Sequence, residues 1–99
     1  MKRAEVIARL RAVEPALRAH GVAALYLFGS YARDEAGPDS DIDVFVDKIP
    51  DRKFGFDELM GSYHALCDAI PGIEISYGTR AGLSKYVKNE VEQQAVRIF

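Results

Sequence analysis

Apolar residues along this 99-residue chain change their spacing from one segment to the next, and the spacing predicts the secondary structure. Spacings of three and four residues indicate a helix with one apolar face, whereas a short apolar run bounded by glycine or polar residues indicates a strand. Pro15 should kink the first helix or start a second short helical piece, because it lacks a backbone donor. In chain order, the predicted elements are a helix over residues 3–19, a strand over 22–28, a helical turn over 31–35, a strand over 41–46, a helix over 56–70, a strand over 73–77 and a helix over 83–98.

The order of these elements predicts an α/β fold. About a dozen residues join the first two strands, which is short for a crossover, so these strands should pair antiparallel. The connection to the third strand is longer and helical, so it can cross over. We therefore expect one domain over residues 1–99, with a small mixed sheet of three to four strands packed by helices.

Composition and charge narrow the classes of protein. The chain is 48% apolar and 28% charged, which is ordinary for a globular domain. It has no apolar run long enough to cross a bilayer and no signal-peptide pattern at its start, so we expect no membrane contact and a cytoplasmic location. Residues 34–58 hold nine acidic and three basic side chains. Such a surface repels nucleic-acid phosphate, so metal binding is favoured over direct nucleic-acid binding.

Asp41 and Asp43 lie two positions apart at the start of the second predicted strand. At this spacing both side chains point to one face, roughly 6–7 Å apart. Carboxylates so placed can bind one or two Mg²⁺ ions, which prefer oxygen ligands and can also take phosphate oxygens of a nucleoside triphosphate. The alternative is that Asp39, Ser40 and Asp41 cap a turn while Asp43 lies on a solvated edge.

Gly29 and Ser30 end the first predicted strand and are the candidate phosphate-binding residues. If the first two strands pair antiparallel, these residues lie beside Asp41 and Asp43. Gly29 would let the backbone approach a phosphate, and Ser30 would supply a hydroxyl donor. The metal site and the phosphate site would then coincide.

Two more charged residues are candidates for this site. Glu74 is the only acid in the third predicted strand, so it is the candidate third carboxylate; alternatively, its charge protects a sheet edge from aggregation. Arg33 could contact a phosphate or pair with Asp41, Asp43 or Glu74, and a plain surface ion pair remains open.

The pattern of Gly29-Ser30, ten residues and then Asp41-Ile42-Asp43 resembles the minimal nucleotidyltransferase (MNT) domains of the DNA polymerase beta-like superfamily. The resemblance extends to Ala32-Arg33 and covers most of the chain. It implies that Gly29 and Ser30 hold the phosphates of ATP and that Asp41, Asp43 and Glu74 bind Mg²⁺. This chain differs from the usual pattern in having Glu74 in place of aspartate and Asp34 in place of a glycine.

The resemblance also implies a partner. Small MNT proteins commonly act as the antitoxin to a HEPN toxin, an RNase, and can transfer AMP from ATP to a tyrosine of that toxin. This chain would then work as a homo-oligomer or as a hetero-oligomer with the toxin. Two other functions stay open: an inactive antitoxin that acts by binding and occlusion, and a nucleotidyltransferase for a small molecule such as an aminoglycoside.

Overall fold

The sheet at the centre of the molecule has four strands, and the computed structural model describes all residues from Met1 to Phe99. The strands are β1 (Val22–Phe28), β2 (Ile42–Lys48), β3 (Ile75–Thr79) and β4 (Val96–Arg97), in the order β3-β2-β1-β4. β1 pairs antiparallel with β2 and with β4, whereas β2 pairs parallel with β3. The predicted mixed sheet and the antiparallel pairing of the first two strands are confirmed.

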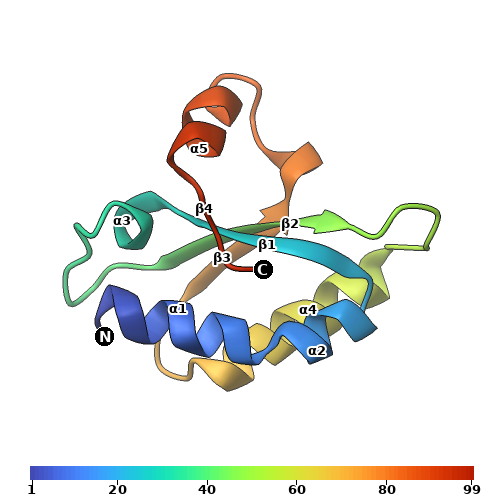
Figure 1. Ribbon diagram of the computed structural model, residues 1–99, viewed down its shortest axis with the longest axis horizontal. Coiled ribbons are helices and arrows are strands. Elements are labelled where there is room, and N and C mark those ends of the chain that lie inside the picture. The colour runs from blue at the N-terminus through green and yellow to red at the C-terminus, as the bar shows by residue number, and fades with distance from the viewer.

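Helices α1 (Arg3–Ala12), α2 (Glu14–Ala19) and α4 (Phe56–Ala69) cover one face of the sheet, which we name the inner face (Figure 1). Pro15 stands in the first turn of α2, so the predicted long helix is divided into two at this point. The core between these layers consists of fully buried aliphatic side chains, among them Val6, Leu10, Leu17, Leu25, Leu27, Ile42, Val44, Val46 and Leu66. No helix of the chain combines the length and the apolar character needed to cross a membrane.

The opposite face of the sheet, the outer face, carries the side chains that alternate with this core. On β2 these are Asp43, Phe45 and Asp47, because successive side chains of a strand point to opposite faces. Phe45 is fully buried and stacks on Tyr26 of β1, with ring centroids 4.9 Å apart. The short helix α5 (Lys88–Gln94) stands on this side of the sheet (Figure 1).

The end of the chain differs from the predicted helix over residues 83–98. A 3₁₀ turn, η1 (Arg80–Gly82), and an irregular segment come first, and α5 then spans seven residues only. The backbone is extended at Ala95, and β4 then pairs with β1. Ile98 is buried because it lies beside the sheet, where its amide donates to the Leu25 carbonyl at 2.8 Å. The helical prediction was therefore wrong at both ends, and Tyr86 is exposed.

Candidate nucleotide-binding site

Gly29 lies in direct contact with the Asp43 carboxylate. It begins the four-residue helix α3 (Gly29–Ala32), which starts two residues before the predicted helical turn. Its φ is +73°, a conformation that residues with a side chain rarely adopt. A Cβ placed on Gly29 would collide with the Asp43 carboxylate oxygen and would lie 3.1 Å from the carboxyl carbon. The absence of a side chain at residue 29 is therefore what lets the turn and the acidic strand meet.

Asp43 stands in the middle of a row that crosses three strands of the outer face. Its backbone partners are Phe28 on β1 and Ser76 on β3. Burial raises the pKa of the Asp43 carboxyl, a hydrogen bond from Ser76 lowers it, and the nearby Asp41 carboxylate raises it further. Arg33 has a smaller, lowering influence on the same pKa. The charged form of Asp43 is therefore disfavoured in the metal-free protein, chiefly because burial removes water from the carboxylate.

Asp41 and Glu74 immediately precede β2 and β3, respectively. Both line a cavity of about 210 Å³, together with Asp39 and Ser40. Glu74 is exposed and immediately precedes β3, and its carbonyl accepts a hydrogen bond from the Ile42 amide at 2.9 Å. β3 therefore begins two residues after the predicted start of the third strand. The residue paired with Asp43 on this strand is Ser76 and not Glu74.

The three predicted metal ligands are not gathered into one coordination set. No group of three or more His, Cys, Asp or Glu side chains is close enough to hold a metal ion. Asp43 nevertheless contacts the Gly29 turn, Asp41 is near enough to raise the pKa of Asp43, and Glu74 shares a cavity with Asp41. Joint binding of Mg²⁺ by Asp41, Asp43 and Glu74 stays a prediction.

Arg33 follows α3 and is exposed. Its Nε donates to Glu35 at 3.2 Å and its Nη1 donates to the side-chain carbonyl of Gln94 at 3.3 Å. It makes no ion pair with Asp41, Asp43 or Glu74. The surface ion pair that the sequence analysis left open is the one present, with Glu35 as the partner. Its side chain is held by exposed partners that an anion could displace.

A turn precedes the acidic strand, but the alternative interpretation of this segment holds only for Ser40. Asp43 is half-buried on the central strand β2, so its predicted position on a solvated edge is wrong. The Ser40 hydroxyl accepts a hydrogen bond from the Gly37 amide at 2.8 Å. Asp34, where the resemblance led us to expect a glycine, has a φ of +58°. This residue therefore keeps the left-handed backbone that a glycine would adopt most easily.

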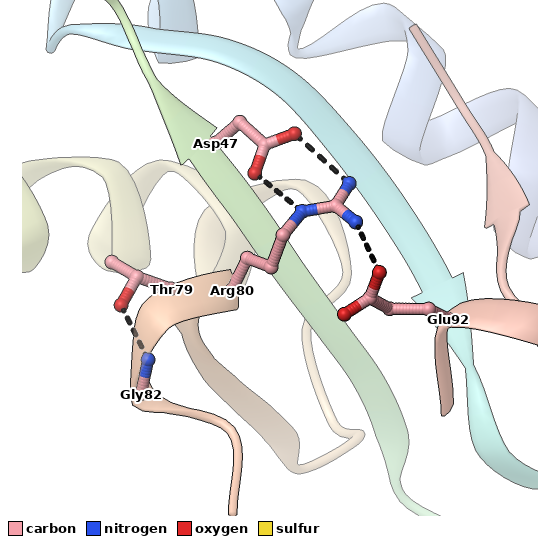
Figure 2. Close-up of polar contacts among 5 residues, drawn as sticks. All are labelled: Asp47, Thr79, Arg80, Gly82 and Glu92. Atoms are coloured by element: carbon pink, nitrogen blue, oxygen red, sulfur yellow. Dashed lines mark hydrogen bonds and ion pairs between the residues drawn. The ribbon is translucent and has the colours of Figure 1, made fainter. Parts of the chain in front are cut away.

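The outer face carries a second polar cluster that was not predicted from the sequence. Figure 2 shows Arg80, the first residue of η1, between Asp47 of β2 and Glu92 of α5. Its guanidinium group donates to both carboxylate oxygens of Asp47, at 2.8 and 3.0 Å, and to Glu92 at 3.1 Å. It also lies over the rings of Tyr26 and Phe45, about 5 Å from each centroid. We call these five residues the Arg80 cluster.

Comparison with known proteins identifies relatives over nearly the whole chain. The family model described as "Nucleotidyltransferase domain" matches residues 10–98. The protein adenylyltransferase MntA of Thermococcus cleftensis is 35% identical over 92 residues, which cover 83% of this chain and 92% of the relative.

Solved structures share the fold. A candidate minimal nucleotidyltransferase superposes with a TM-score of 0.80 and 28% identity, covering 97% of this chain and 95% of the other. A toxin–antitoxin structure solved with AMP-PNP matches with a TM-score of 0.65 over 100% of this chain and 73% of the other. Its 20% identity supports a common fold and no more.

Proposed function

The chain belongs to the nucleotidyltransferase domain family, and on this premise we propose that it is a Mg²⁺-dependent adenylyltransferase that acts as the antitoxin of a toxin–antitoxin pair. The observation that carries the proposal is the contact of Gly29 with Asp43, because it brings the candidate phosphate turn and the acidic strand into one site. Neither motif alone would support a nucleotide site as strongly.

The residues of the site suit a divalent cation. All candidate ligands are carboxylates, which Mg²⁺ prefers, and the raised pKa of Asp43 reflects a charge that a cation would compensate. Asp41, Asp43 and Glu74 would hold the metal. When bound, Mg²⁺ would neutralise phosphate charge and polarise the α-phosphoryl group.

The other residues bind and orient the nucleotide. The Gly29 turn lets the backbone approach the phosphates, and the Ser30 hydroxyl donates to a phosphate oxygen. Arg33 exchanges its exposed partners for a phosphate. An acceptor hydroxyl then forms a bond to the α-phosphorus, the bond to the bridging oxygen of the β-phosphate breaks, and pyrophosphate and the hydroxyl proton leave.

The relatives support both the nucleotide and the acceptor. The matched MntA protein is a protein adenylyltransferase, which favours a protein acceptor over a small molecule. A protein of this fold also occurs in a toxin–antitoxin structure with an ATP analogue. The acceptor we propose is a tyrosine of a HEPN-type toxin encoded beside this chain.

The test is transfer of label from ATP labelled at the α-phosphate. The full chain, Mg²⁺ and the co-encoded partner are incubated together, and label should appear on the partner. The double variant Asp41→Asn with Asp43→Asn should transfer none. Label transfer by this variant would disprove the proposal that Asp41 and Asp43 are required for AMP transfer.

A non-catalytic antitoxin is the second candidate. It is favoured by the absence of a ready three-acid metal set and by the exposed position of Glu74 before β3. Such a protein would neutralise the toxin by covering it. Rescue of growth by the double asparagine variant at wild-type expression would select this function, and loss of rescue would exclude it.

A further inference from the structure

A small pocket lies on the outer face beside Asp43, on the side away from Glu74. Its volume is about 230 Å³, and its lining includes Phe28, Phe45, Ser76, Gly78, Gly82 and Leu83. We call it the Phe28 pocket. Phe28 and Ser76 are also the two strand neighbours of Asp43, so the pocket lies directly beside Asp43.

Gly78 leaves the floor of this pocket open. It pairs with Phe45 in the parallel ladder, and by strand alternation it faces the same side as Ser76. A Cβ placed on Gly78 would meet no atom within 4 Å. The ring centroid of the half-buried Phe28 lies 5.7 Å from that of the fully buried Phe45, with the two rings tilted by 43°. Phe28 therefore supplies the accessible aromatic surface beside the open position.

The chemistry of the lining is that of a site for a flat, uncharged group. No charged side chain lines the pocket. Cavities that hold a whole drug-sized ligand measure roughly 300–1,000 Å³, so this one fits a fragment of a nucleotide and not the complete molecule. Aromatic side chains bind bases of any sequence by stacking, because every base has a π-face.

We propose that the Phe28 pocket binds the nucleobase of the nucleotide. This inference rests on the proposed function, because it takes the phosphates to lie at the Gly29 turn and at Asp43. The base is joined to the α-phosphate through one ribose, so it must lie a short distance from Asp43. The Phe28 pocket is the apolar cavity at that place on the outer face.

The cavity on the other side of Asp43 suits the acceptor better than the base. It is lined by Asp39, Asp41 and Glu74 and contains no aromatic side chain on which a base could stack. A hydroxyl group approaching a metal-bound phosphate tolerates these acids. Base and acceptor are therefore assigned to opposite sides of Asp43.

Two variants change the pocket in opposite directions. Gly78→Val should fill it, and it should not unfold the protein because the added atoms enter open space and valine suits a strand. Leu83→Ala removes part of the wall at a half-buried position. Phe56→Ala is the control, because Phe56 is 75% exposed and lies on α4, against the inner face.

The experiment compares two probes by titration calorimetry in Mg²⁺: a non-hydrolysable ATP analogue, and inorganic tripolyphosphate, which lacks the base. In the wild type the analogue should bind more tightly than tripolyphosphate. Gly78→Val should weaken the analogue about tenfold or more, the scale of one base–aromatic stack, and leave tripolyphosphate within about twofold. Leu83→Ala should act in the same direction, and Phe56→Ala should change neither. Melting temperatures of all variants confirm folding.

Three results would overturn the inference. Equal affinity of the wild type for both probes would show that the base makes no contact. Parallel loss of both probes in Gly78→Val would place the phosphates in the pocket. Unchanged affinity for the analogue with weaker transfer to the partner would show that the pocket takes the acceptor ring. Failure of the proposed function looks different: no AMP transfer by the wild type, while Gly78→Val still removes the preference for the analogue.

Discussion

Asp43 and Asp47 stand on the same strand and the same face, four residues apart, and the protein treats their charges in opposite ways. Asp47 receives two hydrogen bonds from the Arg80 guanidinium group (Figure 2). Asp43 takes part in none of the ion pairs of the chain, and its pKa is raised. The two aspartates share a strand and a face, but only Asp47 has a positively charged side chain as its partner.

The difference lies in what each carboxylate meets across the sheet. Beside Asp47, the rings of Tyr26 and Phe45 support the Arg80 guanidinium group, and Glu92 fixes its far end. Arg80 itself has a raised pKa, chiefly through its hydrogen bonds to Asp47. Beside Asp43, the residues in contact are Gly29 and Ser76, which carry no charge. The nearby Asp41 carboxylate raises the pKa of Asp43 further, and Arg33, which lowers it, makes no ion pair with Asp43. We therefore interpret Asp47, which is paired with Arg80, as a structural residue. Asp43 has no such partner in the protein and is available to bind a metal cation.

Exchange of each aspartate for asparagine should separate the two roles, and this is the largest effect we expect. Asp43→Asn should reduce AMP transfer about a hundredfold or more, or about 2.7 kcal/mol of transition-state stabilisation, with the fold intact. Asp47→Asn should lower the melting temperature and retain the rate within about threefold. Initial rates of label transfer and thermal melts of both variants measure this. Equal loss of activity in the two variants would contradict the distinction.

Gly29→Ala should affect both stability and activity. Alanine in the left-handed region costs about 1–2 kcal/mol, and its Cβ would push the Asp43 carboxylate out of place. The expected result is a melting temperature lower by roughly 5–15 °C and little nucleotide binding. Calorimetric titration with the ATP analogue and a thermal melt measure both. Gly37→Ala is the matched control, because an added Cβ there meets no atom within 4 Å. Wild-type affinity in Gly29→Ala would disprove the close approach.

Arg80→Ala should destabilise the fold by about 1–2 kcal/mol without abolishing catalysis. The bidentate pair and the cation–π contacts are lost, but about a third of each charged side chain is exposed, which limits the effect. Arg80→Lys should recover only part of the loss, because an ammonium group cannot form the two parallel bonds. Urea unfolding measures both, with Lys85→Ala, in an exposed loop, as the control. Full recovery by lysine would show that only net charge matters.

Much of the sheet could be predicted because β1 and β2 are long apolar runs with a short connection. The last strand could not, since β4 has only two residues and Val91, Ala95 and Ile98 fall at helical spacing. Ile98 is apolar because it meets the sheet and not because it lies on a helix. Spacing also fails to predict burial at Phe56. Its position fits the apolar face of α4, yet its side chain is exposed.

The site was predictable in its centre and not at its edges. The antiparallel connection was enough to bring Gly29 beside Asp43. The neighbour on β3 depends on the register of a parallel pair, which no local pattern determines, and it is Ser76 where the sequence suggested Glu74. The Arg80 cluster joins residues 33 positions apart, so its contacts depend on the tertiary fold alone.

The smallest effect we expect is on the stability of the protein without metal. The pKa of Asp43 in the folded state lies above its ordinary value of 3.8, so between these two values the folded chain binds more protons than the unfolded chain. The free energy of unfolding therefore falls as the pH rises through this window, and the penalty remains at neutral pH. Asp43→Asn removes it and should raise the melting temperature at pH 7 by a few degrees at most, because the half-exposed carboxylate is screened by water.

Two measurements check this expectation. The difference in melting temperature between Asp43→Asn and the wild type should shrink as the pH falls through the folded-state pKa of Asp43, and it should be lost below the ordinary value of 3.8. Mg²⁺ at pH 7 should raise the melting temperature of the wild type more than that of the variant, because the cation binds the folded state through this charge. Asp47→Asn provides the contrast, since removing a carboxylate that already has an internal cation should lower stability at neutral pH. If Asp43→Asn also destabilised the metal-free protein, the charge of Asp43 would be compensated from within, and the two aspartates would no longer differ in kind.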